Sequence, residues 1–156
     1  MENPTVQDIM SRNVISVHPD TSVLEAHELI EKNRIDGVPV VDEENKIVGI
    51  LTEYDLIVKG SSLHLTTFQS ILSELKIHHK EKQLQTDVKE LKNLHVKDLM
   101  NDDPLTLPGN ASFEEVVATF RDHHRVNPIP VIDIQKRVIG VVSRFDVLKL
   151  FTMLRT

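Results

Sequence analysis

Two pairs of side chains in this sequence have the types and spacing needed to hold a phosphorylated ligand. Thr52 is followed three residues later by Asp55, and Ser143 is followed at the same spacing by Asp146. Each pair stands where a predicted strand gives way to a predicted helix, so the first amides of that helix lack partners and attract an anion such as a phosphate. The carboxylate can accept hydrogen bonds from paired hydroxyls, as on a ribose.

The same spacing also has a purely structural interpretation. A hydroxyl at a helix cap and a carboxylate three residues later form a capping box. Two earlier helix starts place Glu25 after Ser22 and Glu115 after Ser112, and glutamate is the usual reciprocal partner. Aspartate has a shorter side chain, so at the two later helices we expect it to reach back less easily and to be available to a ligand. The residues alone leave ligand binding and simple capping as open alternatives.

Both pairs lie at matching places in an internal repeat. The segment VQDIM at 6–10 returns as VKDLM at 96–100, and RIDGVPVVD at 34–42 returns as RVNPIPVID at 125–133. KIVGILTEYDL at 46–56 returns as RVIGVVSRFDV at 137–147. With a single insertion in the second copy, the register holds across the whole repeat, so chance is a poor explanation.

Each copy is predicted to fold as strand, helix, strand, strand, helix, which places the chain in the α/β (α+β) class. The first copy has an extended run at 14–17, a helix at 22–33 and strands at 38–41 and 46–52. The second has corresponding segments at 105–107, 112–124, 129–132 and 137–143. The final helices begin at Thr52 and Ser143, which are therefore positioned by the strands before them.

The predicted boundaries are residues 1–60 for the first repeat, 61–93 for a spacer and 94–156 for the second repeat. The spacer has no counterpart in either copy. Its first part places Leu65, Phe68, Leu72 and Leu75 on one helical face, which predicts an amphipathic helix docked on the body. Its second part, from about residue 78, is more charged and predicts a second, more exposed helix.

Composition argues against several classes of function. The chain has no cysteine, so disulfides, thiolate metal sites and cysteine nucleophiles are excluded. Its net charge is -6, which disfavours a nucleic-acid partner. It shows no leader-like start and no apolar run long enough to span a bilayer, so we expect a soluble, cytoplasmic protein without a membrane partner. Neither HExxH nor GxxxxGK[ST] nor a nucleophile elbow occurs, and we expect no enzymatic activity and no metal site.

The pattern as a whole resembles the CBS domain, named after cystathionine beta-synthase, and two tandem copies resemble a Bateman module. The resemblance is carried by the sequence G-h-x-[S/T]-x-x-D, in which h is hydrophobic, and by a preceding h-P-V. The first motif occurs as Gly49, Thr52 and Asp55, and again as Gly140, Ser143 and Asp146. The resemblance implies a pseudo-twofold pair of repeats around a cleft with two sites for adenosine ligands. The expected ligands are AMP, ADP or ATP, with S-adenosylmethionine or cyclic di-AMP as alternatives.

The resemblance also implies roles for individual residues. Asp55 and Asp146 are expected to bind ribose hydroxyls, and Thr52 and Ser143 to lie near the ribose or phosphate. The expected adenine contacts come from the backbone and side chains around Val38, Pro39, Ile129 and Pro130. A disc-like homodimer through the helices that follow the motif is implied as well, and an unidentified effector protein is expected. The apolar VLKLFTML after Asp146 suits such a dimer, because one face would be exposed in a monomer.

The two sites are expected to differ in charge. Glu53 follows the first hydroxyl residue, whereas Arg144 follows the second, and His124 precedes the central strand of the second copy. An acid at a helix start opposes a phosphate, while a guanidinium can clamp it. We therefore expect the Ser143/Asp146 site to bind the more highly charged ligand more tightly, with Arg144 and His124 as phosphate contacts. A solvated Arg144 without such a contact is the alternative.

The sequence thus predicts a regulatory module that senses an adenine nucleotide and signals to a partner by conformational change. The spacer is the candidate moving part. The competing hypothesis is a scaffolding or self-association module whose ligand sites are vestigial.

Overall fold

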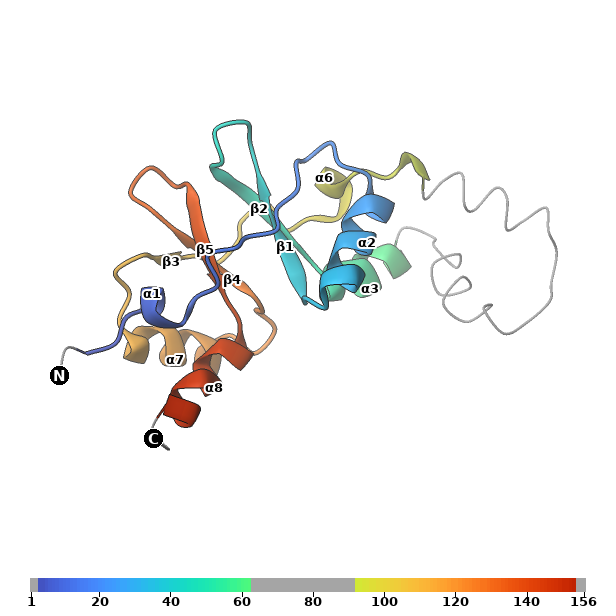
Figure 1. Ribbon diagram of the computed structural model, residues 1–156. Coiled ribbons are helices and arrows are strands. Elements are labelled where there is room, and N and C mark those ends of the chain that lie inside the picture. Colours follow the sequence, from blue (N-terminus) through green and yellow to red (C-terminus); the bar gives the residue numbers. More distant parts are fainter. Residues whose placement is uncertain (1–2, 63–91, 154–156) are drawn as a thin grey trace.

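A computed structural model describes residues 3–62 and 92–153 of the protein (Figure 1). The first repeat contains α1 (Val6–Ile9), α2 (Val23–Asn33), β1 (Gly37–Val41), β2 (Ile47–Thr52) and α3 (Glu53–Ser62). The second contains α6 (Val96–Leu99), β3 (Leu107–Pro108), α7 (Phe113–Asp122), β4 (Ile129–Ile132), β5 (Val138–Val142) and α8 (Arg144–Met153). This order of helices and strands confirms the predicted fold class. The predicted amphipathic spacer helix and most of the second spacer helix lie outside the described residues.

The strands of each repeat form a small sheet around one antiparallel hairpin. In the first repeat β1 pairs with β2, and Val17 adds a single parallel bridge to Val40. In the second repeat β4 pairs with β5, and β3 runs parallel to β4 through Leu107 and Val131. All five residues of β1 and the first three residues of β4 are buried.

The long helices begin at hydroxyl caps and bury one apolar face. Ser22 accepts a hydrogen bond from the Glu25 amide at 3.1 Å, and α2 buries Val23, Ala26 and Ile30 at helical spacing. In the second repeat α7 begins at Ser112, with the predicted capping box to Glu115. The two predicted helices at 22–33 and 112–124 are therefore confirmed to within about two residues at their ends.

The short helices α1 and α6 each stand at the start of one repeat in the sequence but pack on the other repeat in the structure. The Val6 amide donates to Ala111 O at 2.8 Å, and the Val96 amide donates to Thr21 O at the same distance. Figure 1 shows α1 beside α7 and α8, and α6 beside α2 and α3. As a result, Val6 and Ile9 lie in the apolar core of the second repeat, while Val96 and Leu99 lie in that of the first.

Because each short helix packs on the opposite repeat, an exchange of α1 and α6 between the repeats, each motif needs a glycine. A Cβ at Gly49 would lie 2.9 Å from the carbonyl oxygen of Asn101, and a Cβ at Gly140 would lie 3.1 Å from that of Ser11. Both contacts are with the segment that follows an exchanged helix. Glycine therefore lets the chain of one repeat pass close to the sheet of the other.

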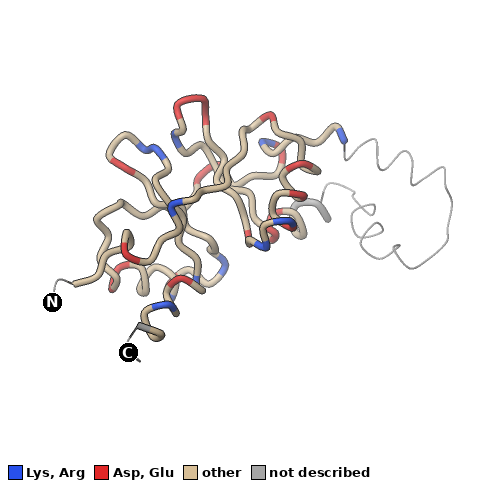
Figure 2. The backbone as a smooth tube through the Cα atoms, viewed as in Figure 1, with Lys and Arg blue, Asp and Glu red and all other residues tan. Residues whose placement is uncertain are grey.

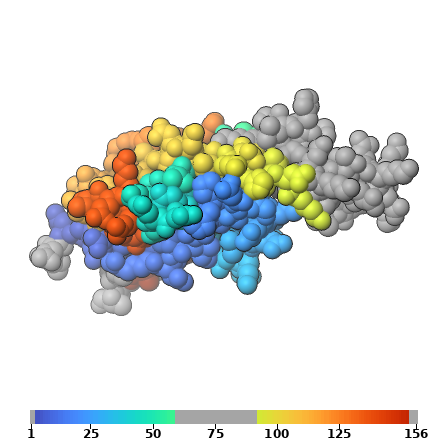
Figure 3. Space-filling view, turned by 90° about the horizontal axis from the view of Figure 1, so that it is seen from above, coloured from blue at the N-terminus to red at the C-terminus, as the bar shows by residue number. Residues whose placement is uncertain are grey.

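The two hairpins lie side by side, as the view in Figure 3 shows. Their turns are joined by backbone hydrogen bonds, from Ile47 N to Lys136 O at 2.9 Å and from Val138 N to Asn45 O at 3.0 Å. Figure 2 shows acidic positions at the tip of the β1–β2 hairpin, and both acidic and basic positions in the neighbouring β4–β5 turn. Hydrogen bonds between the two turns thus support the pseudo-twofold arrangement of the repeats. Across residues 3–62 and 92–153, none of the helices has the length and apolar character needed to cross a membrane.

Candidate functional site

The two predicted hydroxyl and carboxylate pairs have nearly identical geometry. The amide and hydroxyl of Thr52 donate to Asp55 Oδ2 at 3.0 and 2.9 Å, and those of Ser143 donate to Asp146 Oδ2 at 2.8 and 2.9 Å. Both aspartates are buried, with 6% and 8% of their surface exposed. Each pair stands at the junction of a strand and a helix, as predicted.

Both aspartates take part in a capping box, so the expectation that aspartate reaches back less easily is wrong. Asp8 and Asp98 make the same bond at the starts of α1 and α6, and across the four helix starts the cap amide lies 2.7 to 3.0 Å from the carboxylate. Side-chain length therefore does not distinguish capping from binding. The cap uses only Oδ2 of each carboxylate, and each carboxylate oxygen can accept more than one hydrogen bond, so capping and ligand binding are compatible.

Each pair faces a cleft that is built from both repeats. The first, which we name the Thr52 cleft, encloses about 320 Å³. The first repeat contributes Ile50, Thr52, Tyr54 and Asp55. The second contributes Asn101, Leu105, Arg125, Val126, Asn127 and Pro128.

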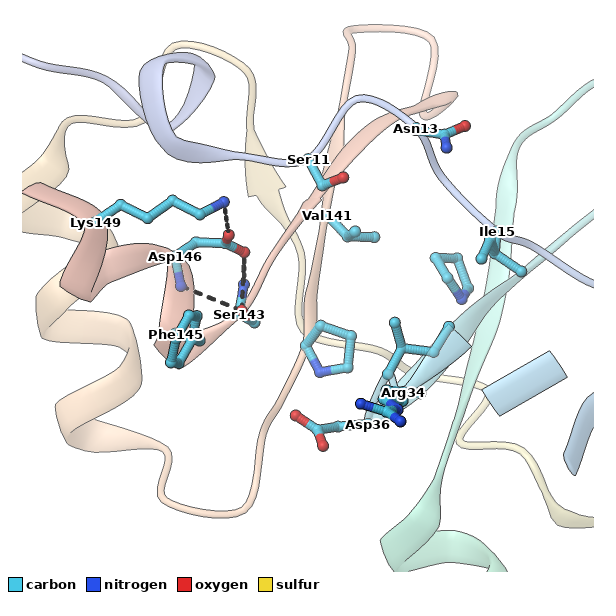
Figure 4. A pocket seen from close by; sticks show the side chains of 14 residues that line it. Ser11, Asn13, Ile15, Arg34, Asp36, Val141, Ser143, Phe145, Asp146 and Lys149 are labelled. Atoms are coloured by element: carbon cyan, nitrogen blue, oxygen red, sulfur yellow. Dashed lines mark hydrogen bonds and ion pairs between the residues drawn. The ribbon is translucent and has the colours of Figure 1, made fainter. Parts of the chain in front are cut away.

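The second, which we name the Ser143 cleft, encloses about 350 Å³ and is shown in Figure 4. The second repeat contributes Pro128, Val141, Ser143, Phe145, Asp146 and Lys149. The first contributes Ser11, Asn13, Ile15, Arg34, Ile35, Asp36, Gly37 and Pro39. Both volumes fall within the range of about 300 to 1,000 Å³ typical of small-molecule sites.

Of the four predicted adenine contacts, one lines a cleft. Pro39 lies in the wall of the Ser143 cleft. Val38 and Ile129 lie in the two apolar cores instead, because successive side chains of a strand point to opposite faces. Pro130 is fully buried and lies outside the linings of both clefts. Adenine contact through these three residues stays a prediction.

Arg144 and His124 lie outside both linings. The Arg144 guanidinium donates to the carbonyl oxygens of His123, at 3.3 Å, and His124, and it lies 5.8 Å from the centre of the Phe120 ring. It therefore partners the carbonyls just beyond the end of α7, and the side chain of His124 is exposed. Phosphate contact by these two residues stays a prediction, and their placement does not favour it.

Two other arginines line the clefts, each opposite the motif of the other repeat. Arg125 belongs to the second repeat but lines the Thr52 cleft, where Nη1 donates to Tyr54 Oη at 3.0 Å and the guanidinium lies 5.6 Å from the centre of that ring. Arg34 belongs to the first repeat and lines the Ser143 cleft. The sequence carried a signal for this pair, since the two arginines occupy matching positions before the central strands.

Asp36, in the wall of the Ser143 cleft, is bonded to residues of both repeats. Asn127 Nδ2 donates to Asp36 Oδ2 at 2.5 Å, and the Glu53 amide donates to Asp36 O at 3.0 Å. Burial raises the pKa of Glu53, and the negative charges of Asp36 and Asp55 raise it further. Glu53 lines neither cleft, so its place in the structure does not favour the expected opposition to a bound phosphate. Within the described part of the chain, no three His, Asp or Glu side chains gather as metal ligands would.

The sequence model of the CBS domain matches residues 6–61 and 96–152. The chloroplastic CBS domain-containing protein CBSX2 of Arabidopsis thaliana is 29% identical over 152 residues, covering 93% of this chain and 62% of the relative. L-aspartate semialdehyde sulfurtransferase of Methanocaldococcus jannaschii is 28% identical over 146 residues, covering 94% of this chain and 23% of that protein. The chain therefore spans less than two thirds of either relative.

Solved structures of similar chains share the fold. CBSX2 in complex with AMP has a TM-score of 0.72 and 25% identity, with 97% of this chain and 98% of that chain covered. The CBS domain pair of protein MJ0100 in complex with 5'-methylthioadenosine and S-adenosyl-L-methionine has a TM-score of 0.68 and 25% identity, with 95% and 99% covered.

Proposed function

The chain belongs to the CBS domain family, and from this premise we propose that it is a regulatory module that binds an adenosine ligand and signals its presence to a partner. The observation that carries the proposal is the pair of composite clefts. Each brings together a buried aspartate at a helix start and an arginine from the opposite repeat. The AMP complex of CBSX2 and the complex of the MJ0100 pair support this class of ligand.

The geometry suggests how an adenine nucleotide binds. The hydroxyls of its ribose donate to Asp55 in one cleft or to Asp146 in the other, while Thr52 or Ser143 lies beside the ribose or phosphate. Arg125 and Arg34 then supply the cation for the phosphate from across each cleft. Adenine occupies the apolar part of the wall, which includes Pro39 in the Ser143 cleft.

We also propose that the Ser143 cleft prefers the more highly charged ligand, because of cations other than Arg144 and His124. Arg34 and Lys149 line this cleft, whereas Arg125 lines the Thr52 cleft with its guanidinium already bonded to Tyr54. Lys149 is paired with Asp146, so the Ser143 cleft presents a second cation to a polyphosphate only when the ligand displaces this lysine. Arg34 and Lys149, rather than Arg144, carry this preference.

A thermal-shift panel tests the proposal. At a ligand concentration one hundred times the dissociation constant, we expect about 2.7 kcal/mol of stabilisation and a rise in Tm of about 5 to 10 °C. The panel consists of AMP, ADP, ATP, S-adenosylmethionine, NAD and cyclic di-AMP, with GTP as the control for the base. If none of the adenosine ligands raises Tm, the scaffolding hypothesis is favoured instead.

Cytoplasmic location and the lack of enzymatic activity remain predictions.

The exposed faces of α3 and α8 support the proposed homodimer. Ile57 on α3 is 57% exposed, and Leu148 and Phe151 on α8 are 54% and 63% exposed. Apolar side chains so exposed on helix surfaces are typical of an interaction surface. A second copy covering both helices would give the disc-like dimer, and the effector protein would recognise its shape.

We expect the substitution Leu148→Glu to convert the dimer into a monomer at micromolar concentration, because a charge would be buried at the centre of the interface. Sedimentation velocity measures this change. Ile134→Glu is the matched control, since Ile134 is fully exposed but lies in the turn between β4 and β5. A dimer that survives Leu148→Glu, or is lost equally with Ile134→Glu, would place the interface elsewhere.

A further inference from the structure

Lys149 and Asp146 form an ion pair in the wall of the Ser143 cleft (Figure 4). Lys149 Nζ contacts Asp146 Oδ1, while Asp146 Oδ2 accepts the two hydrogen bonds from Ser143. The side chain of Asp146 is 11% exposed and that of Lys149 is 49% exposed. The carboxylate proposed to hold the ribose therefore has a partner at each oxygen, and one of these partners is a lysine that can move.

A ribose hydroxyl that reaches Asp146 Oδ1 has to share this oxygen with the lysine or displace it. If the ligand is a neutral nucleoside, the ammonium loses part of its counter-charge and gains nothing in return. If the ligand carries a phosphate, the displaced ammonium has a new anion within the same cleft. The free energy needed to displace the lysine from the carboxylate is therefore offset only when the ligand carries a phosphate.

The other charged groups of this cleft do not remove the effect. Arg34 and Asp36 face Asp146 and Lys149 from the opposite wall, as Figure 4 shows, and they contribute one positive and one negative charge. The charges of Arg34 and Asp36 cancel. Whether Lys149 stays paired with Asp146 therefore decides how the cleft responds to ligand charge.

We infer that Lys149 is a specificity-determining residue that makes the Ser143 cleft select nucleoside phosphates over neutral nucleosides. The inference rests on the proposed function and names the ligand class of this one cleft. A lysine that only stabilised α8 would affect charged and neutral ligands alike, whereas the effect of Lys149 depends on the charge of the ligand.

Isothermal titration calorimetry of AMP and of adenosine against the full chain tests the inference. Asp55→Ala serves as the background, so that the Ser143 cleft is measured alone. We expect Lys149→Met to weaken AMP binding about tenfold, while the affinity for adenosine stays unchanged or rises. Lys149→Arg, which keeps the charge, should retain the preference for AMP. The matched control is Lys97→Met, which breaks an exposed ion pair with Asp20 at 2.6 Å and lines neither cleft.

Two results would overturn the inference. An equal loss of AMP and adenosine affinity in Lys149→Met would show that the lysine only supports Asp146, and unchanged affinities would make it a surface charge. If the protein with both clefts intact binds neither ligand, the proposed function fails and the inference fails with it. Failure of the inference alone is seen as AMP binding that does not depend on Lys149.

Discussion

Replacing Asp146 with alanine is expected to weaken AMP binding in the Ser143 cleft by about 100-fold. The substitution removes the acceptor of two ribose hydroxyls, and a hydrogen bond to a charged group contributes about 1.5 to 3 kcal/mol. Isothermal titration calorimetry should show the loss of one class of sites. Asp55→Ala should remove the other class, and we expect the smaller loss of ATP affinity there, because the Ser143 cleft is proposed to prefer the more charged ligand.

A matched control separates binding from capping, since Asp146 also caps α8 through Ser143. Asp98→Ala removes the corresponding bond to the His95 amide at the start of α6 and lines neither cleft. It should cost stability, by about 0.5 to 2 kcal/mol, without changing AMP affinity. Retained affinity in Asp146→Ala would leave capping as the whole role of this aspartate. Equal losses of ATP affinity in the Asp55 and Asp146 variants, or a loss only with Asp55→Ala, would contradict the proposed inequality of the clefts.

Ile9→Ala is expected to lower the free energy of unfolding by about 2 to 4 kcal/mol. Ile9 is 3% exposed and packs in the core of the second repeat, although it belongs to the first repeat in sequence. Truncating it leaves a cavity that the rigid surroundings fill only in part. Denaturant unfolding measures the loss, and Lys97→Met, an exposed change on the corresponding short helix α6, should leave stability within about 0.5 kcal/mol of the original.

Amide hydrogen exchange shows which core is destabilised. It thereby tests directly whether α1 and α6 pack on the opposite repeat. Ile9→Ala should lower the protection of amides in β4 and β5, whereas Leu99→Ala, in the core of the first repeat, should lower protection in β1 and β2. Local opening follows the core that has lost contacts. The reverse pattern would mean that each repeat packs its own short helix.

Much of the local structure could be predicted from residues close together in the sequence. The apolar spacing of Val23, Ala26 and Ile30 is enough to define α2, and the hydroxyl caps mark where the long helices begin. The repeated motif also located both strand–helix junctions, with Thr52 and Ser143 at the caps. The short helices α1 and α6 were missed, because four residues are too few to show helical periodicity.

The sequence by itself determined the repeat, the order of the long helices and the hairpin strands, and the two aspartates at the helix starts, because these features depend on neighbours along the chain. Only the tertiary structure decided which side chains share a cleft. The pseudo-twofold relation places Arg125 opposite Thr52 and Arg34 opposite Ser143, and Arg144 bonds instead to the carbonyls beyond α7. Local periodicity contains no information about which repeat a segment will face. That choice follows from burying Val6, Ile9, Val96 and Leu99 in the opposite core, which brings the two halves of each cleft together.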